Sequence, residues 1–141
     1  MATSNDVVNV ARRMVGTRWR HQGRAPGIGL DCVGVVVCTG RELGVLDYDL
    51  REYPRHAAVN GFMDYFRAHG NEIALRKVHP GAVLALQEKT FPCHCGIVAS
   101  DVHGLTLIHA YAPRRRVVEE RLTPEWWAKV LAVFEFRGVG A

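Results

Sequence analysis

The chain has 141 residues, of which 48% are hydrophobic and 23% are charged. These proportions are ordinary for a globular protein, and the length suits a single domain that can bury a hydrophobic core without stabilising cross-links such as disulfides. The formal net charge of +4 suits an anionic partner, such as a cell-wall polymer or a nucleic acid, but is too small to select one. The longest apolar run, at residues 33–38, is far too short to cross a membrane.

The cysteine content indicates synthesis in a reducing compartment. A domain of this size requires no disulfides, and Cys93 and Cys95 are too close in sequence for an easy mutual bridge. The first residues are polar and Arg12 and Arg13 interrupt the apolar positions that follow, so no secretory signal peptide is visible. We therefore expect a secreted form to need another route of export. The four cysteines are Cys32, Cys38, Cys93 and Cys95.

The first part of the chain predicts a helix followed by a loop. Ser4 or Asn5 can cap a helix whose apolar residues lie between positions 7 and 15, with Gly16 at its end. Residues 16–29 are rich in glycine and in side chains that form hydrogen bonds. This composition predicts a loop that forms one wall of a cleft.

Residues 32–43 can be interpreted in two ways. Their run of three valines suits a buried strand. In contrast, Asp31 can cap a helix and Gly44 can end one, and these signals favour the helix. Gly34 and Gly40 would let a sheet pack closely against that helix.

The remaining segments predict a short helix and then an antiparallel sheet. Aromatic residues on one face indicate a helix at residues 61–69, after a loop at residues 47–60. Alternating apolar residues and turn signals predict strands at residues 73–75, 83–86, 93–99, 105–111, 116–120 and 130–136, with a loop at 87–92 and a short helix after Thr123. The last strand is expected to place on one face Val130, Ala132, Phe134 and Phe136. Helices followed by an antiparallel sheet predict an α+β domain.

Cys32 is the candidate nucleophile, because it follows an acidic residue at the expected start of a helix. If Asp31 is the N-cap, its carboxylate accepts a backbone N–H bond and Cys32 takes the first helical position. Backbone N–H groups and the positive end of the helix dipole then surround the sulfur, which lowers the pKa of a thiol. The alternative is a buried structural thiol, since free cysteine is among the most buried residue types.

Two histidines in the predicted strands can supply the base that a nucleophilic thiol needs. If the turn spans residues 101–104, Ser100 pairs with Leu105 and His94 lies diagonally from His109 on the same face. A turn shorter by two residues would make the two histidines direct partners. We expect Cys32 to attack, His94 to take its proton or to pair with the thiolate as an imidazolium, and His109 to orient the ring of His94.

Four short motifs then occur in a consistent order: Asp31-Cys32-Val33-Gly34, Pro80-Gly81, His94-Cys95-Gly96-Ile97-Val98 and Ile108-His109-Ala110. With these motifs the chain resembles the NlpC/P60 cysteine peptidases, papain-like enzymes that cut peptidoglycan stem peptides. The resemblance runs from about Gly16 to Phe136. The lead-in Gly16-Thr17-x-Trp19-x-His21-Gln22-Gly23 looks most like the members carried by tailed phages and phage-like gene transfer agents.

The resemblance implies a papain-like fold, with N-terminal helices packed on a central antiparallel sheet, and a peptidoglycan endopeptidase. It implies cleavage of the γ-D-glutamyl–diaminopimelate bond by Cys32, His94 and His109, with no cofactor and no metal. The implied partners are the stem peptide and the tail-tip or hub proteins of a phage-like particle, without nucleic acid or a membrane span. The implied location is the tail tip of a virion, made in the host cytoplasm and acting on the wall or periplasm of the target cell.

Three positions depart from the family pattern, which usually has Tyr near the site of Trp19, Ser at Val33 and Asp at Ala82. These departures leave two alternatives open. One is a structural plug or assembly module of the tail tip that has lost catalysis, and the other is amidase or acyl-transfer chemistry on a different amide.

The residues around the thiol are expected to line an oxyanion and substrate cleft. In the family, the Tyr hydroxyl is thought to help stabilise the oxyanion. Trp offers only an indole N–H, so this role would fall to His21, Gln22 or the backbone N–H of Cys32. The expected cleft residues are Asp31, Trp19, His21 and Gln22.

A metal site is the main rival interpretation, because Cys93-x-Cys95 lies beside His94. Structural zinc sites usually have ligand gaps of roughly two to four residues, and the two cysteines lie on the strand face opposite His94. We therefore expect no metal, and we interpret Cys38 and Cys95 as core thiols. Two further expectations are one core anchor and one interface residue among Trp126 and Trp127, and a solvated loop at Arg114-Arg115-Arg116.

Overall fold

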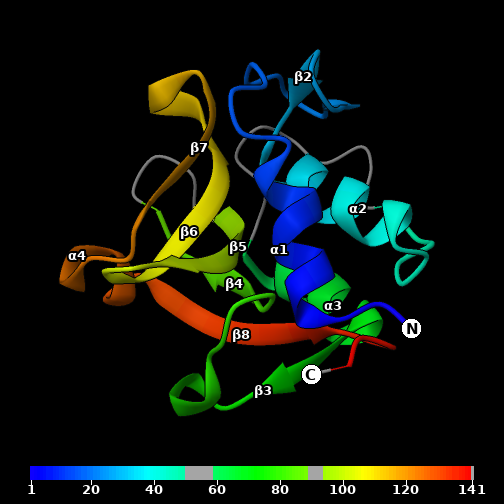
Figure 1. The fold of residues 1–141 in the computed structure, drawn as a ribbon, viewed down its shortest axis with the longest axis vertical. Coiled ribbons are helices and arrows are strands. Elements are labelled where there is room, and N and C mark those ends of the chain that lie inside the picture. Colours follow the sequence, from blue (N-terminus) through cyan, green and yellow to red (C-terminus); the bar gives the residue numbers. More distant parts are fainter. Residues whose placement is uncertain (50–58, 89–93, 141) are drawn as a thin grey trace.

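The computed structural model describes residues 1–49, 59–88 and 94–140, and Figure 1 shows its helices and strands. The helices are α1 (Ser4–Arg12), α2 (Cys32–Glu42), α3 (Val59–His69) and α4 (Pro124–Trp127), with 3-10 turns η1 (Leu75–Lys77) and η2 (Ala112–Arg114). The strands are β1 (Arg24–Ala25), β2 (Gly29–Leu30), β3 (Gly70–Ile73), β4 (Val83–Leu86), β5 (His94–Asp101), β6 (Gly104–Tyr111), β7 (Arg116–Arg121) and β8 (Val130–Phe136). The expected strand start at Cys93, and most of the expected loops at 47–60 and 87–92, lie outside the described residues.

A six-stranded antiparallel sheet forms the centre of the fold, so the predicted α+β class is confirmed. Its strand order is β3-β8-β4-β5-β6-β7. Helices α1, α2 and α3 pack on one face and contribute to a large apolar core, whereas α4 lies at the other face over a smaller one (Figure 1). β1 and β2 form a separate two-stranded hairpin that contacts α2. The sheet is therefore covered on both faces.

Residues 32–42 form a helix, as the end signals predicted. Asp31 caps it by accepting a hydrogen bond of 2.8 Å from the backbone N–H of Gly34, and Gly44 follows the helix at a φ of 69°. The valine run is buried between α1 and the sheet, and this burial outweighs the weak preference of valine for strands. Close approach at Gly40 is confirmed, since a Cβ there would lie 2.9 Å from the ring of Phe136 in β8.

The first helix begins one residue earlier than predicted, and Thr3 is its cap instead of Ser4 or Asn5. The Thr3 hydroxyl accepts a hydrogen bond of 3.2 Å from the backbone N–H of Asp6, and the Asp6 carboxylate accepts one of 2.9 Å from the N–H of Thr3. This reciprocal capping box satisfies two backbone donors that a serine at position 4 would leave open.

The strand predicted at residues 73–75 is wrong in its position. The chain enters β3 directly at Gly70 and pairs with β8 from Gly70 opposite Phe136 to Ile73 opposite Val133. Leu75 already belongs to η1 and is exposed. Gly70 thus ends α3 and opens the strand, which periodicity alone could not indicate.

A β-bulge in the last strand changes the side of Val130. Ala85 pairs with Ala132 but the next residue, Leu86, pairs with Val130, which leaves Leu131 without an opposite partner in β4. Because one extra residue reverses the alternation of side chains, Val130 packs with the smaller core and Phe134 with the larger one. The expectation of one shared face for the four residues is therefore wrong at Val130.

We predict that Gly34→Ala destabilises the protein. A Cβ at position 34 would lie 2.2 Å from the carbonyl oxygen of Gly23, a rigid backbone atom. Overpacking of this kind costs about 1–3 kcal/mol, which exceeds the gain of about 1 kcal/mol from replacing a helical glycine. Denaturant unfolding would measure the change. The control on the same helix is the exposed Glu42→Ala, expected within about 0.5 kcal/mol, and a Gly34→Ala variant as stable as wild type would contradict this packing.

Candidate active site

The thiol of Cys32 lies at the first position of α2, directly after the buried cap residue Asp31. One oxygen of the Asp31 carboxylate accepts hydrogen bonds from the Gly34 N–H and, at 2.9 Å, from the guanidinium of Arg24. The other oxygen accepts a bond of 2.8 Å from the backbone N–H of Gln22. One carboxylate therefore fixes the start of the helix and the loop that leads to it.

A chain of hydrogen bonds connects the two predicted histidines to a carboxylate. Nε2 of His94 lies 2.7 Å from Nδ1 of His109, and Nε2 of His109 lies 2.8 Å from Oε2 of Glu120. The other carboxylate oxygen accepts a bond of 3.2 Å from the indole N–H of Trp126. His94 is 4% exposed and His109 is fully buried, so both imidazoles are shielded from solvent.

These contacts determine which ring nitrogens carry hydrogen when both histidines are neutral. The hydrogen bond from His109 is the largest of several effects that lower the pKa of Glu120, so this carboxylate is ionised and only accepts. His109 must then donate from Nε2 and accept at Nδ1, and His94 must donate from Nε2. The Nδ1 atom of His94 is thus left without its hydrogen and can act as a base.

The Cys32 thiol is stabilised as a thiolate. A hydrogen bond with Cys95 is the largest effect that lowers its pKa, followed by the hydrogen bond and the charge of His94, whereas burial and Asp31 raise it. The net effect lowers the pKa from 9.0 to about 6. At pH 7 such a group is about nine-tenths thiolate, compared with about one-hundredth for an unperturbed thiol. The site therefore holds a thiolate next to an imidazole.

The other described cysteines have raised pKa values. Burial raises the pKa of Cys38, whose thiol lies 3.4 Å from the carbonyl oxygen of Arg24. Burial and the hydrogen bond with Cys32 raise that of Cys95 well above its usual value. Both are core thiols in burial, but Cys95 also forms a hydrogen bond with Cys32, a contact that the sequence did not predict. The position of Cys95 directly after His94 in the predicted strand was the feature of the sequence that could have indicated this contact.

The predicted cleft residues are arranged around the start of α2. Trp19 is half-buried and pairs with Leu30, and its backbone N–H donates a bond of 2.9 Å to the carbonyl of Arg115. His21 and Gln22 are exposed, and Gln22 adopts a left-handed φ of 56°. The structure thus brings together Cys32, His94 and His109. It links Gln22 to that group through the buried Asp31.

Sequence reasoning missed Glu120 and the aromatic residues that surround the histidines. The Tyr111 ring stacks on that of His109 at a centroid distance of 5.1 Å, and Trp126 meets the same ring edge-on, also at 5.1 Å. Trp126 is the core anchor that was expected from the tryptophan pair. The register of β6 with β7, which pairs His109 with Val118, places Glu120 diagonally from His109 on the same face.

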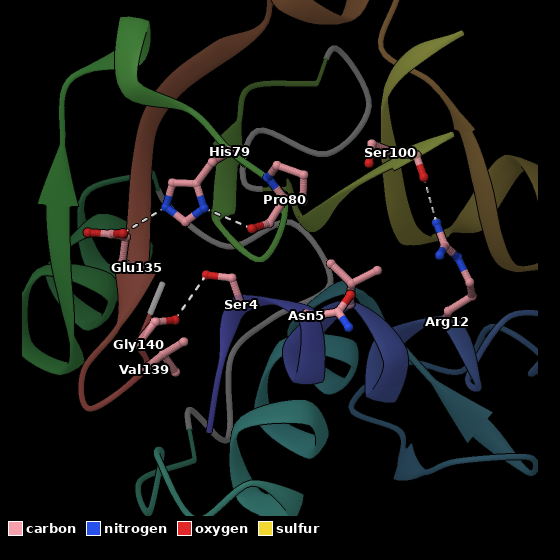
Figure 2. A pocket seen from close by; sticks show the side chains of 10 residues that line it. Ser4, Asn5, Arg12, His79, Pro80, Ser100, Glu135, Val139 and Gly140 are labelled. Atoms are coloured by element: carbon pink, nitrogen blue, oxygen red, sulfur yellow. Dashed lines mark hydrogen bonds and ion pairs between the residues drawn. The ribbon is translucent and has the colours of Figure 1, made fainter. Parts of the chain in front are cut away.

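A second hollow lies away from these residues (Figure 2). It is bounded by the start of α1, residues 79–80 and the C-terminal segment, and contains His79 between the Glu135 carboxylate at 2.7 Å and the Pro80 carbonyl at 2.8 Å. None of its lining residues is among those predicted for the catalytic site.

The following two statements hold for residues 1–49, 59–88 and 94–140. No helix there is long and apolar enough to span a membrane. No group of three or more histidine, cysteine or acidic side chains there could hold a metal ion. Cys93, which the metal interpretation used, lies outside these ranges.

We predict that iodoacetamide alkylates Cys32 before the other cysteines. Because the thiolate is the reactive form, the rate should rise with pH through an inflection near pH 6 and level off above it. Mass spectrometry of tryptic peptides at several pH values would measure this profile.

Two variants serve as controls for this profile. Cys95→Ala removes the largest effect that lowers the pKa, so the inflection should move to higher pH, whereas Cys38→Ala should leave it in place. An inflection above about pH 8 in the wild type, or faster labelling of another cysteine, would contradict a stabilised thiolate.

Comparison with known proteins gives a clear result for the fold. No protein-family model matches the chain, and no curated protein does. Among solved structures, the chain is similar to the NlpC/p60 domain of the peptidoglycan hydrolase SagA, with a TM-score of 0.67 and 18% identity over 95% of this chain and 99% of that one.

Two longer proteins have the same fold over part of their length. NlpC1 from Trichomonas vaginalis has a TM-score of 0.69 at 15% identity, over 96% of this chain and 45% of that one. An NlpC/P60 family protein from Bacillus cereus has a TM-score of 0.69 at 15% identity, over 95% of this chain and 40% of that one. The chain thus spans less than half of each of these two proteins. Its helices and antiparallel sheet have the fold of the NlpC/P60 domains.

Proposed function

We propose that this protein is a cysteine endopeptidase that hydrolyses amide bonds in peptidoglycan stem peptides. The observation that carries the proposal is the connected set of Cys32, His94, His109 and Glu120. It combines a thiol with a pKa of about 6, a hydrogen-bonded imidazole beside it and a carboxylate at the far end. A structural thiol requires none of these groups.

In the proposed reaction, the thiolate of Cys32 attacks the carbonyl carbon of the scissile amide. His94, as an imidazolium, gives its Nδ1 proton to the leaving nitrogen, the C–N bond breaks and a thioester remains on Cys32. Neutral His94 then takes a proton from water, which attacks the thioester, and the thiolate leaves. His109 holds the ring of His94 in place throughout, and Glu120 holds His109.

The oxyanion of each tetrahedral intermediate needs nearby hydrogen-bond donors. We assign this role to the backbone N–H of Cys32, at the positive end of α2, together with a side chain of the adjoining loop, His21 or Gln22. The backbone N–H of Gln22 already donates to Asp31, so Gln22 would act through its side-chain amide. Asp31 acts indirectly, by positioning this loop and the helix.

Two considerations support peptidoglycan as the substrate. The SagA domain, which covers nearly the same length, is described as that of a peptidoglycan hydrolase. The sequence motifs resemble those of enzymes that cut stem peptides. We propose the γ-D-glutamyl–diaminopimelate bond as the target and the tail tip of a phage-like particle as the location, made in the host cytoplasm. Proteomic detection of the chain in purified particles is the test of that location.

A structural plug module is the alternative function. It is favoured by Val33 and Ala82, which are fully buried and replace the polar residues that are usual in the family. Such a module would keep the fold and its contacts in the particle without hydrolysing the wall. Activity measurements separate the two functions.

We predict that purified protein releases new amines from peptidoglycan and that Cys32→Ala reduces this rate by about 10³-fold or more. Mass spectrometry of the fragments would identify the bond that is cut, including an amidase or acyl-transfer product. Cys38→Ala is the matched control and should retain activity, since this thiol lies in the apolar core and its hydrogen bond goes to the Arg24 carbonyl. Equal activity of wild type and Cys32→Ala would refute the enzymatic proposal.

We predict that Glu120→Gln lowers kcat by about 10–100-fold. Both carboxylate oxygens of Glu120 accept hydrogen bonds, from His109 and from Trp126. An amide must turn its NH₂ group toward one of these N–H donors, so either the correct form of His109 or the position of Trp126 is lost.

The control for this variant is Glu119→Gln, which also removes a hydrogen-bonded carboxylate but on the opposite face, where Glu119 pairs with Arg12 at 2.7 Å. The pH dependence of Cys32 alkylation provides a second measurement. A variant that only lowers the stability of the fold would leave the inflection of this profile at the same pH. If both variants lower kcat equally and leave the inflection in place, Glu120 has no positioning role.

A further inference from the structure

A groove with a volume of about 610 Å³ lies next to the candidate active site. Its walls come from two segments far apart in the sequence, the start of the loop at 16–19 and the turn that follows β6. The residues that line it are Gly16, Arg18, Trp19, Ala112, Arg115 and Arg116. We call it the arginine groove.

Backbone hydrogen bonds hold the two walls of the arginine groove together. Arg18 pairs with Arg116 in an antiparallel bridge, and the N–H of Trp19 donates to the carbonyl of Arg115 at 2.9 Å. On the far side, Gly16 donates to the Val117 carbonyl at 2.9 Å. The groove is therefore a fixed feature of the backbone, and its three arginines project from rigid positions.

The charge of the groove is uncompensated. Arg18, Arg115 and Arg116 are exposed, no carboxylate lines the groove, and their guanidinium groups have no ion-pair partner in the described part of the chain. Arg12 and Arg24, in contrast, pair with the carboxylates of Glu119 and Asp31. Three unpaired guanidinium groups around one hollow favour a ligand that carries negative charge.

Both walls of the groove continue into the catalytic segments. On one side, Trp19 pairs with Leu30, two residues before Cys32. On the other side, Ala112 follows Tyr111, whose ring lies 5.7 Å from that of His94 and stacks on His109. A peptide held in the groove would therefore extend from the reactive thiol along a cationic channel.

We propose that the arginine groove binds carboxylate groups of an acidic peptide substrate, which it aligns for attack by Cys32. Guanidinium groups bind carboxylates through paired hydrogen bonds, and the half-buried Trp19 offers an apolar side wall for the peptide. Arg115 and Arg116 are exposed, as expected for the solvated segment Arg114-Arg115-Arg116, and the proposal adds a binding role to these two. The proposal rests on the peptidase function, and it names the chemistry that selects the substrate.

The test compares two triple variants of equal charge. One carries Arg18→Gln, Arg115→Gln and Arg116→Gln, and the control carries Arg76→Gln, Lys77→Gln and Arg121→Gln at exposed positions outside the groove. With a synthetic stem peptide that has free carboxylates, the groove variant should raise KM by about tenfold with kcat within about twofold. The control should match wild type. With the same peptide amidated at its carboxylates, all three proteins should have equal KM values.

Binding measurements separate this inference from the proposed function. Calorimetry of the acidic peptide with the Cys32→Ala protein, with and without the three groove substitutions, measures recognition without turnover. If the groove substitutions abolish binding in the Cys32→Ala protein while the protein with Cys32 intact hydrolyses no peptide, the groove is supported and the peptidase function is refuted. Hydrolysis with no difference between the groove and control variants refutes the groove. Binding of a phosphate-bearing wall polymer in place of the peptide also overturns it.

Discussion

The buried carboxylate of Asp31 is the contact on which the candidate site depends. It accepts hydrogen bonds from the start of α2, from the backbone of Gln22 and from the guanidinium of Arg24, which is itself paired with Asp49 at 2.9 Å. A carboxylate that is 3% exposed is tolerated only with such a set of donors, and removal of one partner of a buried pair costs about 3–5 kcal/mol. The position of Cys32 and the shape of the adjoining loop therefore have a common cause.

The sheet supplies the opposite half of the site, and its register sets the distance between the two histidines. Ser100 pairs with Leu105 across the hairpin, which brings His94 and His109 onto the same face. Gly96 leaves room for this arrangement, because a Cβ there would lie 2.9 Å from the Cβ of His109. A helix terminus thus provides the thiolate, three neighbouring strands provide the groups that would serve it, and neither half is complete alone.

Much of this arrangement could be predicted, because it follows local rules. The cap at Asp31 identified α2, and the alternation of side chains with a short turn identified the histidine pair. The parts that were missed depend on contacts between distant segments. Glu120 faces His109 only through the register of β6 with β7, and Val130 changes sides only because a bulge at Leu131 reverses the alternation. The N-cap of α1 was predicted wrongly for a different reason. Asp6, which completes the capping box with Thr3, is visible in the sequence and could have identified Thr3 as the cap.

The two described ends of the chain are joined by a short parallel bridge. The N–H of Ser4 donates to the carbonyl of Gly140 at 3.0 Å, and the N–H of Gly140 donates to the carbonyl of Ala2 at 2.9 Å. Tethers attached at these two points would pull against this bridge before they pulled across the sheet. Mechanical tension would then act first on these two backbone hydrogen bonds, which lie far along the chain from Cys32. The distances between the thiol and the imidazoles would stay unchanged until these hydrogen bonds had broken.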